Sequence, residues 1–319
     1  MAKLAFLFPG QGSQYPGMGR DLAQNFVAAR EVFDEVDAAL GIKLSKICWE
    51  GSEQELKKTE NTQPAILTVS VAAYRVLREK AVTPDVVAGH SLGEYSALVA
   101  AGALDLAAAA KLVRKRGRYM QEAVPEGQGA MAAILGLPPA EVVEITKKAA
   151  GAEVLAAANL NSMEQTVISG TAAAVKRTVE MASQLGAKRA VMLPVSAPFH
   201  CEMMMPAQKR LEADLRAAKF HDLAFPLFTN VDAEPITKGD DARESLIRQV
   251  CMPVRWYESI QAMIGDGIHM FVEVGPGRVL SGLSRQIDRG VRGVGVEDSA
   301  SLNAALEKIH QVQVEKAES

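Results

Sequence analysis

The sequence has few aromatic residues and no excess of charge of either sign. Phe, Trp and Tyr make up 5% of its 319 residues, too few for aromatic platforms that stack nucleic-acid bases. Lys and Arg number 35 and Asp and Glu 38, so the formal net charge of −3 argues against a general nucleic-acid binder. No apolar run reaches the roughly 18 residues of a membrane span. We therefore expect no nucleic acid and no membrane among the partners.

Cysteines are also scarce. Cys48, Cys201 and Cys251 lie far apart and form no C-x-x-C pair, which favours free thiols over a disulfide framework or a zinc site and predicts no metal. The apolar run Leu4–Phe8 is too short for a signal peptide and stops at Pro9, so we interpret it as a buried strand. A cytoplasmic location follows as the expectation.

What the sequence does contain is ordinary globular composition, with 48% hydrophobic and 23% charged residues. Short apolar runs alternate with longer helical stretches, which favours an α/β fold with a parallel sheet. In the first and last parts of the chain we expect strands at 4–8, 85–88, 227–230 and 268–274, helices at about 18–39, 52–58, 64–80, 92–101, 106–122 and 203–218, and a fraying tail after Ile309.

The middle of the chain has a different order of elements. We expect strands at 130–135, 154–158, 166–169 and 189–195 and helices at 138–149 and 172–185. The order βαββαβ is typical of a ferredoxin-like domain, and turn-forming residues at 125–127 and 196–198 flank it. The sequence therefore predicts a large α/β domain formed by residues 1–127 and 197–319, with a small domain inserted at 128–196.

The motif Gly89-His90-Ser91-Leu92-Gly93 is a G-x-S-x-G between an expected strand and an expected helix. A serine on so tight a turn has strained backbone angles, and the flanking glycines remove side chains that would clash there. The N–H groups of the following helix face any negative charge that develops beside the hydroxyl. The bare motif also occurs by chance, but the strand and helix around it favour Ser91 as a nucleophile.

A serine nucleophile needs a base, and the sequence offers five histidines. His200 lies just beyond the expected insertion, where a loop can reach a site between two domains. His90 is interpreted as structural, because neighbours in such a turn point in different directions. We expect His269 to be packed within a strand, and His221 and His310 to lie at the surface. His200 is the favoured base.

The expected helix 106–122 carries an arginine on its apolar face. Ala109, Val113, Arg116 and Met120 follow one another at spacings of four, three and four residues and form one stripe. A buried guanidinium without a partner is costly. Arg116 therefore snorkels to the surface, pairs with a structural carboxylate, or binds the carboxylate of a substrate with its planar fork.

The loop 10–14, Gly-Gln-Gly-Ser-Gln, follows the first expected strand. It lacks the endings of a Walker or dinucleotide-binding motif and is not a phosphate loop. A glycine-rich turn lets the backbone approach a ligand closely, so the N–H of Gln11 is a candidate oxyanion donor. In hydrolase-like folds the other donor belongs to the residue after the nucleophile, which is Leu92 here.

Together these residues resemble the malonyl-CoA:acyl-carrier-protein transacylase family and the related acyltransferase domains of polyketide and fatty acid synthases. The resemblance extends over nearly the whole chain and implies a hydrolase-like α/β domain with a ferredoxin-like insertion. The motifs that carry it are FPGQGSQ at 8–14, NTQPA at 61–65, GHSLGEY at 89–95, Arg116-Gly117, His200 and EVGPG at 273–277.

The resemblance implies a two-step exchange that needs no cofactor. Ser91 attacks the malonyl thioester of coenzyme A, with His200 as general base and the N–H groups of Gln11 and Leu92 holding the oxyanion. The malonyl-enzyme then passes its acyl group to the phosphopantetheine thiol of a transiently bound acyl carrier protein. We expect the enzyme itself to be a monomer.

The same resemblance implies roles for four further residues. Arg116 binds the free malonate carboxylate, the backbone carbonyl of Gln249 orients the histidine, and Met120 and Phe199 line the pocket. In the synthase acyltransferases a Phe at the position of Phe199 goes with malonyl, whereas many stand-alone fatty acid members have a smaller residue. The sequence leaves the pathway open between fatty acid and polyketide synthesis.

Two other functions stay open at this point. A serine acyl-thioester hydrolase would use the same nucleophile with water as the acceptor. A non-catalytic interaction module could keep the fold, although drift in such a module would be expected to remove Ser91, His200 or Arg116.

Overall fold

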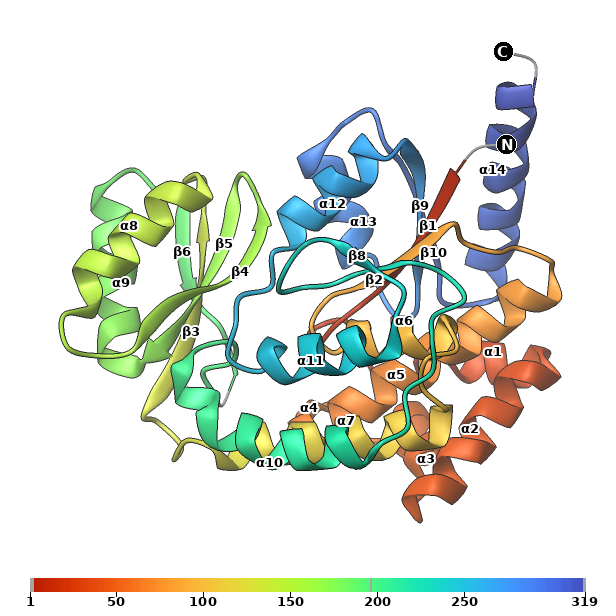
Figure 1. Cartoon of the computed structure of the whole chain (residues 1–319), viewed down its shortest axis with the longest axis horizontal. Coiled ribbons are helices and arrows are strands. Elements are labelled where there is room, and N and C mark those ends of the chain that lie inside the picture. The colour runs from red at the N-terminus through yellow and green to blue at the C-terminus, as the bar shows by residue number, and fades with distance from the viewer. Residues whose placement is uncertain (1–2, 196, 318–319) are drawn as a thin grey trace.

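The computed structural model describes residues 3–195 and 197–317 and contains two separate β-sheets. The larger sheet has six strands and the smaller has four, and they lie next to each other along the long axis of the molecule (Figure 1). Helices pack on both sheets. The predicted α/β class, with a parallel sheet and a separate small antiparallel sheet, is confirmed.

The larger sheet has the strand order β10-β9-β1-β2-β7-β8. The first five of these strands run parallel, and β8 pairs antiparallel with β7. Leu4, Phe6 and Phe8 of β1 pack into the core on one face, and Ala5 and Leu7 into the core on the other. Burial on both faces explains why this strand is apolar throughout. The strands are β1 (Lys3–Phe8), β2 (Val86–Gly89), β7 (Leu227–Phe228), β8 (Pro235–Ile236), β9 (Ile268–Val274) and β10 (Arg292–Val296).

Helices cover both faces of this sheet (Figure 1). One core contains residues of α1, α2, α5 and α7, and the other contains residues of α12 and α13. The helices of this part are α1 (Arg20–Asn25), α2 (Val27–Leu40), α3 (Leu44–Glu50), α4 (Glu53–Lys57), α5 (Thr59–Glu79), α6 (Gly93–Ala100), α7 (Leu106–Glu122), α10 (Met205–Ala217), α11 (Gly239–Gln249), α12 (Trp256–Gly265), α13 (Val279–Ile287) and α14 (Ser299–Ala317).

The smaller sheet is antiparallel and has the order β4-β5-β3-β6. With its two helices it forms the predicted βαββαβ unit, in which Val142 of α8 and Val175 of α9 share a core with Ile134 and Ile168 of the sheet. The elements are β3 (Gly129–Leu135), α8 (Pro139–Ala150), β4 (Leu155–Ser162), β5 (Gln165–Thr171), α9 (Ala172–Gln184) and β6 (Arg189–Met192).

Strand β4 joins the smaller sheet to the rest of the chain. The N–H of Leu160 donates to the carbonyl of Val254 at 2.9 Å, and the N–H of Val254 donates to the carbonyl of Ala158 at 2.8 Å. These bonds fix the smaller sheet beside the carboxyl ends of β1 and β2. The division into domains at 127/128 and 196/197 stays a prediction, and Ser196, Met1, Ala2 and residues 318–319 lie outside the described residues.

Several predicted helix boundaries are wrong. The helix expected at 18–39 is interrupted at Phe26, whose backbone is extended (φ −130°, ψ 126°). The helix expected from Pro64 begins five residues earlier, at Thr59. Burial of Asn61 and Gln63 against the core overrides the local bias of proline against a preceding helical residue.

Two further expectations are wrong. The tail after Ile309, expected to fray, continues helix α14 up to Ala317. Leu302, Ile309 and Val312 of this helix are buried on one face and hold it against the core. His269 is exposed rather than packed. The register between β1 and β9 shifts at this position, so a bulge turns the side chain out of the core.

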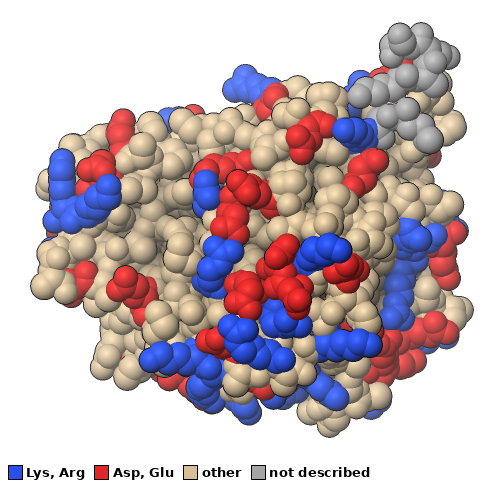
Figure 2. Space-filling model, viewed as in Figure 1, with Lys and Arg blue, Asp and Glu red and all other residues tan. Residues whose placement is uncertain are grey.

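Acidic and basic side chains are interspersed on the face shown in Figure 2. Ion pairs such as Lys115–Asp214, at 2.5 Å, join neighbouring helices. This mixture agrees with the small net charge. Among the residues that the structure describes, none of the helices combines the length and the apolar character needed to traverse a bilayer.

The close crossing of β1 and α6 generates a stability prediction. A Cβ atom at Gly93 would lie 2.0 Å from the carbonyl oxygen of Phe8, and backbone at such a crossing cannot move cheaply. Gly93→Ala should lower the free energy of unfolding by at least about 3 kcal/mol, measured by urea denaturation. Gly282→Ala is the control, because nothing lies within 4 Å of its Cβ in α13, and it should be neutral or stabilise by up to about 1 kcal/mol. Equal stability of the two variants would show that the crossing is not tight.

Candidate active site

Ser91 occupies the sharp turn between β2 and α6. Its φ of 51° lies in the left-handed region, which is strained for a residue other than glycine. The side chain of Asn230 braces this turn on both sides, accepting from the N–H of Ser91 at 2.7 Å and donating to the carbonyl of Gly89 at 2.7 Å. Because the N–H of Ser91 is already bonded, oxyanion donors have to come from other residues.

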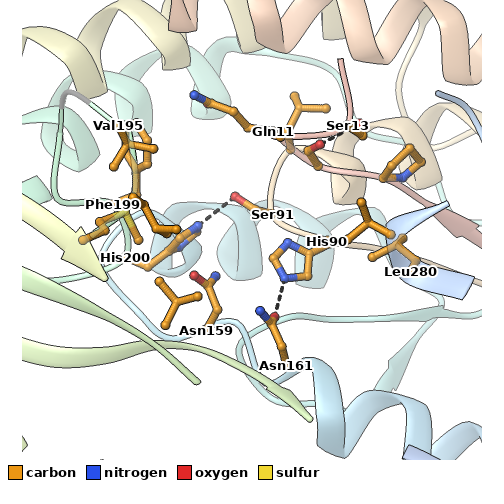
Figure 3. Close-up of a pocket in the computed structure, with 18 of the residues that line it drawn as sticks. Gln11, Ser13, His90, Ser91, Asn159, Asn161, Val195, Phe199, His200 and Leu280 are labelled. Carbon is orange, nitrogen blue, oxygen red and sulfur yellow. Dashed lines mark hydrogen bonds between the residues drawn. The ribbon is translucent and has the colours of Figure 1, made fainter. Parts of the chain in front are cut away.

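A chain of two hydrogen bonds runs from Ser91 through His200 to Gln249. The Oγ of Ser91 lies 2.7 Å from Nε2 of His200 (Figure 3). Nδ1 of His200 lies 2.8 Å from the backbone carbonyl of Gln249. A carbonyl only accepts, so Nδ1 carries the proton and Nε2 is free to accept from the serine hydroxyl. His200, like Ser91, has a positive φ, at 58°.

The electrostatic surroundings keep this imidazole neutral. Burial and the nearby Arg116 guanidinium lower the pKa of His200 to about 3. A neutral imidazole with an unprotonated Nε2 is the form that can take a proton from a hydroxyl.

Arg116 of α7 is only 1% exposed, on the apolar face predicted from the sequence. Nη1 donates to Oε1 of Gln63 at 2.9 Å, and Nη2 donates to Oγ of Ser91 at 3.1 Å and to Oε1 of Gln249 at 3.0 Å. All three partners are neutral, and no carboxylate of the described residues lies within ion-pair distance of Arg116. The snorkelling and structural-carboxylate interpretations are therefore wrong, and burial lowers the pKa of this guanidinium.

The loop after β1 lies against the serine turn. A Cβ atom at Gly10 would be 2.4 Å from the carbonyl oxygen of His90, so only glycine allows this approach. The loop thereby brings Gln11 to the same cavity as Leu92, which stands at the N-cap of α6. Both predicted oxyanion donors thus border the space beside Ser91.

The cavity has a volume of about 230 Å³ and lies between the two sheets (Figure 3). The residues that line it from the larger part include Ser91, His200, Arg116, Met120 and Phe199. The smaller sheet contributes Met131, Asn159, Asn161, Gln165 and Val167. Gln249 is fully buried and contacts the site from behind His200 and Arg116.

Sequence reasoning missed several residues that shape this site. Gln63, within the quoted NTQPA motif, holds Arg116, and Asn230, just after β7, braces the serine turn. Asn161 of β4 lies 2.9 Å from Nε2 of His90, whose ring also contacts Trp256. For Asn230 the sequence offered one indication of a role in the site, namely its position at the carboxyl end of an expected parallel strand.

The comparison with protein families matches the acyl transferase domain over residues 5–310. The chain belongs to this family. It is 47% identical over 312 residues to the malonyl CoA-acyl carrier protein transacylase of Bacillus subtilis, a match that covers 98% of each chain.

Solved structures of the acyl transferase family are also similar. The malonyl CoA-acyl carrier protein transacylase from Coxiella burnetii matches with a TM-score of 0.94 and 43% identity, over 96% of this chain and 97% of that one. A malonyl-transacylase solved in complex with its type II PKS acyl-carrier protein matches with a TM-score of 0.94 and 44% identity, over 96% and 100%.

The neutral state of His200 leads to a spectroscopic prediction. With its pKa lowered to about 3, the His200 ring should stay uncharged from pH 8 to pH 5, where an unperturbed histidine, with a pKa of about 6.5, gains its proton. Its ¹⁵N ring resonances, assigned with a His200→Asn variant, should stay constant over this range. A midpoint near pH 6.5 would show that the ring is not desolvated as described.

Proposed function

We propose that this acyl transferase moves a malonyl group from coenzyme A to the phosphopantetheine thiol of an acyl carrier protein. The observation that carries the proposal is the Arg116 guanidinium, which is buried, lacks an anionic partner and lies 3.1 Å from the Ser91 hydroxyl. A malonyl group supplies a carboxylate at one end and a reacting carbonyl at the other, and a guanidinium binds a carboxylate in a bidentate manner. The malonyl transacylases among the relatives support the same substrate.

In the first step Oγ of Ser91 attacks the thioester carbonyl while Nε2 of His200 takes the hydroxyl proton. The N–H groups of Gln11 and Leu92 hold the oxyanion. The tetrahedral intermediate then collapses, the C–S bond breaks, and His200 returns the proton to the departing thiolate of coenzyme A. A malonyl ester on Ser91 is the product.

In the second step the thiol of the carrier protein gives its proton to His200 and attacks the ester. The C–O bond to Ser91 breaks, and the serine recovers the proton. The carrier protein binds transiently, which the complex of a related malonyl-transacylase with its carrier protein supports. We propose that the enzyme works as a monomer in the cytoplasm, in two domains, and requires no cofactor or metal.

Transfer competes with hydrolysis of the acyl-enzyme. The reacting carbonyl sits in a cavity of about 230 Å³ lined in part by Met120, Met131, Val167 and Phe199, whose apolar side chains disfavour water. Transfer to a thiol is therefore favoured over the alternative, a hydrolase that releases free malonate.

The acyl-enzyme can be detected directly. Brief exposure to malonyl-CoA should add one malonyl group to the wild-type protein, seen by intact mass spectrometry, and none to Ser91→Ala. Adding a phosphopantetheinylated carrier protein should move the adduct to the carrier. An adduct of equal yield on Ser91→Ala would place the nucleophile elsewhere, and free malonate forming faster than malonyl-carrier would favour the hydrolase.

The role of Arg116 predicts a change in substrate preference. Arg116→Ala should lower kcat/KM for malonyl-CoA by about 100-fold or more, since a charge-assisted pair is lost. Transfer from acetyl-CoA, which has no second carboxylate, should be spared or improved. Steady-state kinetics with both thioesters measure the ratio, and equal losses for both would mean that Arg116 is structural.

A further inference from the structure

A second charged residue, Glu94, lies fully buried behind the site. It is on the first turn of α6, three residues after Ser91. Its Oε2 accepts from the backbone N–H of Asn230 and from Nε2 of Gln249, each at 2.9 Å, and its Oε1 accepts from the hydroxyl of Ser245 at 3.3 Å. Glu94 is outside the residues that line the cavity, so it does not reach a bound acyl group directly.

The contact of Glu94 with Gln249 affects how the Gln249 side chain is oriented, because one end of the amide is a donor (N–H₂) and the other is an acceptor (C=O). Nε2 of Gln249 donates to Glu94 and to the backbone carbonyl of Ser91 at 3.0 Å, while Oε1 accepts from Nη2 of Arg116 at 3.0 Å. A flipped amide would place its oxygen against the oxygen of Glu94 and its N–H₂ against the guanidinium. Glu94, the Ser91 carbonyl and, at 3.3 Å, Oδ1 of Asn230 accept from Nε2, and Arg116 donates to Oε1. Together these groups favour one orientation of the amide, and Glu94 is the acceptor nearest to Nε2.

We propose that Glu94 is a positioning residue for recognition of the malonyl carboxylate. By accepting from Nε2 of Gln249, it turns the amide oxygen toward Arg116 and so fixes the guanidinium where the carboxylate binds. Glu94 contacts neither substrate nor reacting atoms, and it acts through Gln249. This inference rests on the proposed function, because it assumes that Arg116 binds the acyl carboxylate.

The effect depends on a hydrogen-bond acceptor rather than on a negative charge. Glu94 forms no ion pair with any described residue, and its contacts are neutral N–H and O–H donors. Burial raises its pKa to about 7, so a neutral carboxyl is already within reach near physiological pH. In Glu94→Gln, the neutral side chain can keep its amide oxygen toward the donors of Asn230 and Gln249 and direct its N–H₂ group toward the hydroxyl oxygen of Ser245.

The test compares Glu94→Met, which is similar in size but lacks the acceptor, with Glu94→Gln. The readout is the ratio of kcat/KM for malonyl-CoA to kcat/KM for acetyl-CoA. Glu94→Met should lower this ratio about tenfold, chiefly through a higher KM for malonyl-CoA, because the Gln249 amide loses the nearest acceptor that holds its oxygen toward Arg116. Glu94→Gln should restore the wild-type ratio.

Glu273→Met supplies a matched control. Glu273 is also fully buried and accepts from two backbone N–H groups, those of Leu280 and Ser281, but it has no contact with Gln249 or Arg116. Its replacement should reduce stability and leave the malonyl-to-acetyl ratio unchanged. A drop in that ratio as large as for Glu94→Met would assign the effect to general destabilisation and overturn the inference.

A double-mutant cycle with Gln249→Met tests the route of the effect. If Glu94 acts through Gln249, Glu94→Met should not lower the ratio further in the Gln249→Met background. The inference would be overturned if the two substitutions lowered the malonyl-to-acetyl ratio additively. It would also be overturned if Glu94→Gln lowered this ratio as much as Glu94→Met. If Glu94→Met does not fold, Gln249→Met alone should reproduce the loss, and an unchanged ratio there would contradict the proposal.

These outcomes are separable from failure of the proposed function. If the wild-type protein does not prefer malonyl-CoA to acetyl-CoA, the proposed function itself fails. If the wild type shows that preference and Glu94→Met retains it, only the role of Glu94 is wrong.

Discussion

The site depends on one buried positive charge without an anionic partner. Arg116 is held by the neutral oxygens of Gln63, Gln249 and Ser91, and a buried charge in such surroundings favours any anion that can reach it. Burial and, after it, the same charge lower the pKa of His200, which keeps the imidazole neutral. We therefore expect one guanidinium both to attract an acid substrate and to keep the neighbouring imidazole unprotonated.

Backbone strain places the two reacting groups. Ser91 and His200 both have φ values in the left-handed region, at 51° and 58°, although neither is a glycine. Ser91 donates its backbone N–H to Asn230 and His200 donates Nδ1–H to the carbonyl of Gln249, and the parallel sheet behind them is packed on both faces. A rigid core thus supports two locally unfavourable conformations, as is common at functional sites.

The second sheet completes the cavity. The bonds between β4 and Val254 fix it beside the larger sheet, and its side chains close the space in front of Ser91. An acyl-enzyme that must wait for a thiol benefits from such a partly enclosed and partly apolar space, because water is an abundant competitor.

The sequence alone determined the elements whose causes are local. The strand–turn–helix around Ser91, the apolar stripe that buries Arg116 and the βαββαβ order all follow from residue spacing and turn chemistry, and the structure has them. The helix break at Phe26, the early start of α5 at Thr59 and the bulge that exposes His269 were not predicted, because packing overrides local propensity there.

Only the tertiary structure decided which distant residues meet. Ser91, Arg116, His200 and Gln249 come from four separate segments, and their hydrogen bonds span up to 158 residues of sequence. Asn230 lies outside the quoted motifs and Glu94 lies within GHSLGEY, but their contacts with each other and with Gln249 arise only because the fold brings the segments around 91, 230 and 249 together. Whether Arg116 had a carboxylate partner could likewise not be read from spacing, because that depends on every element packed around the guanidinium.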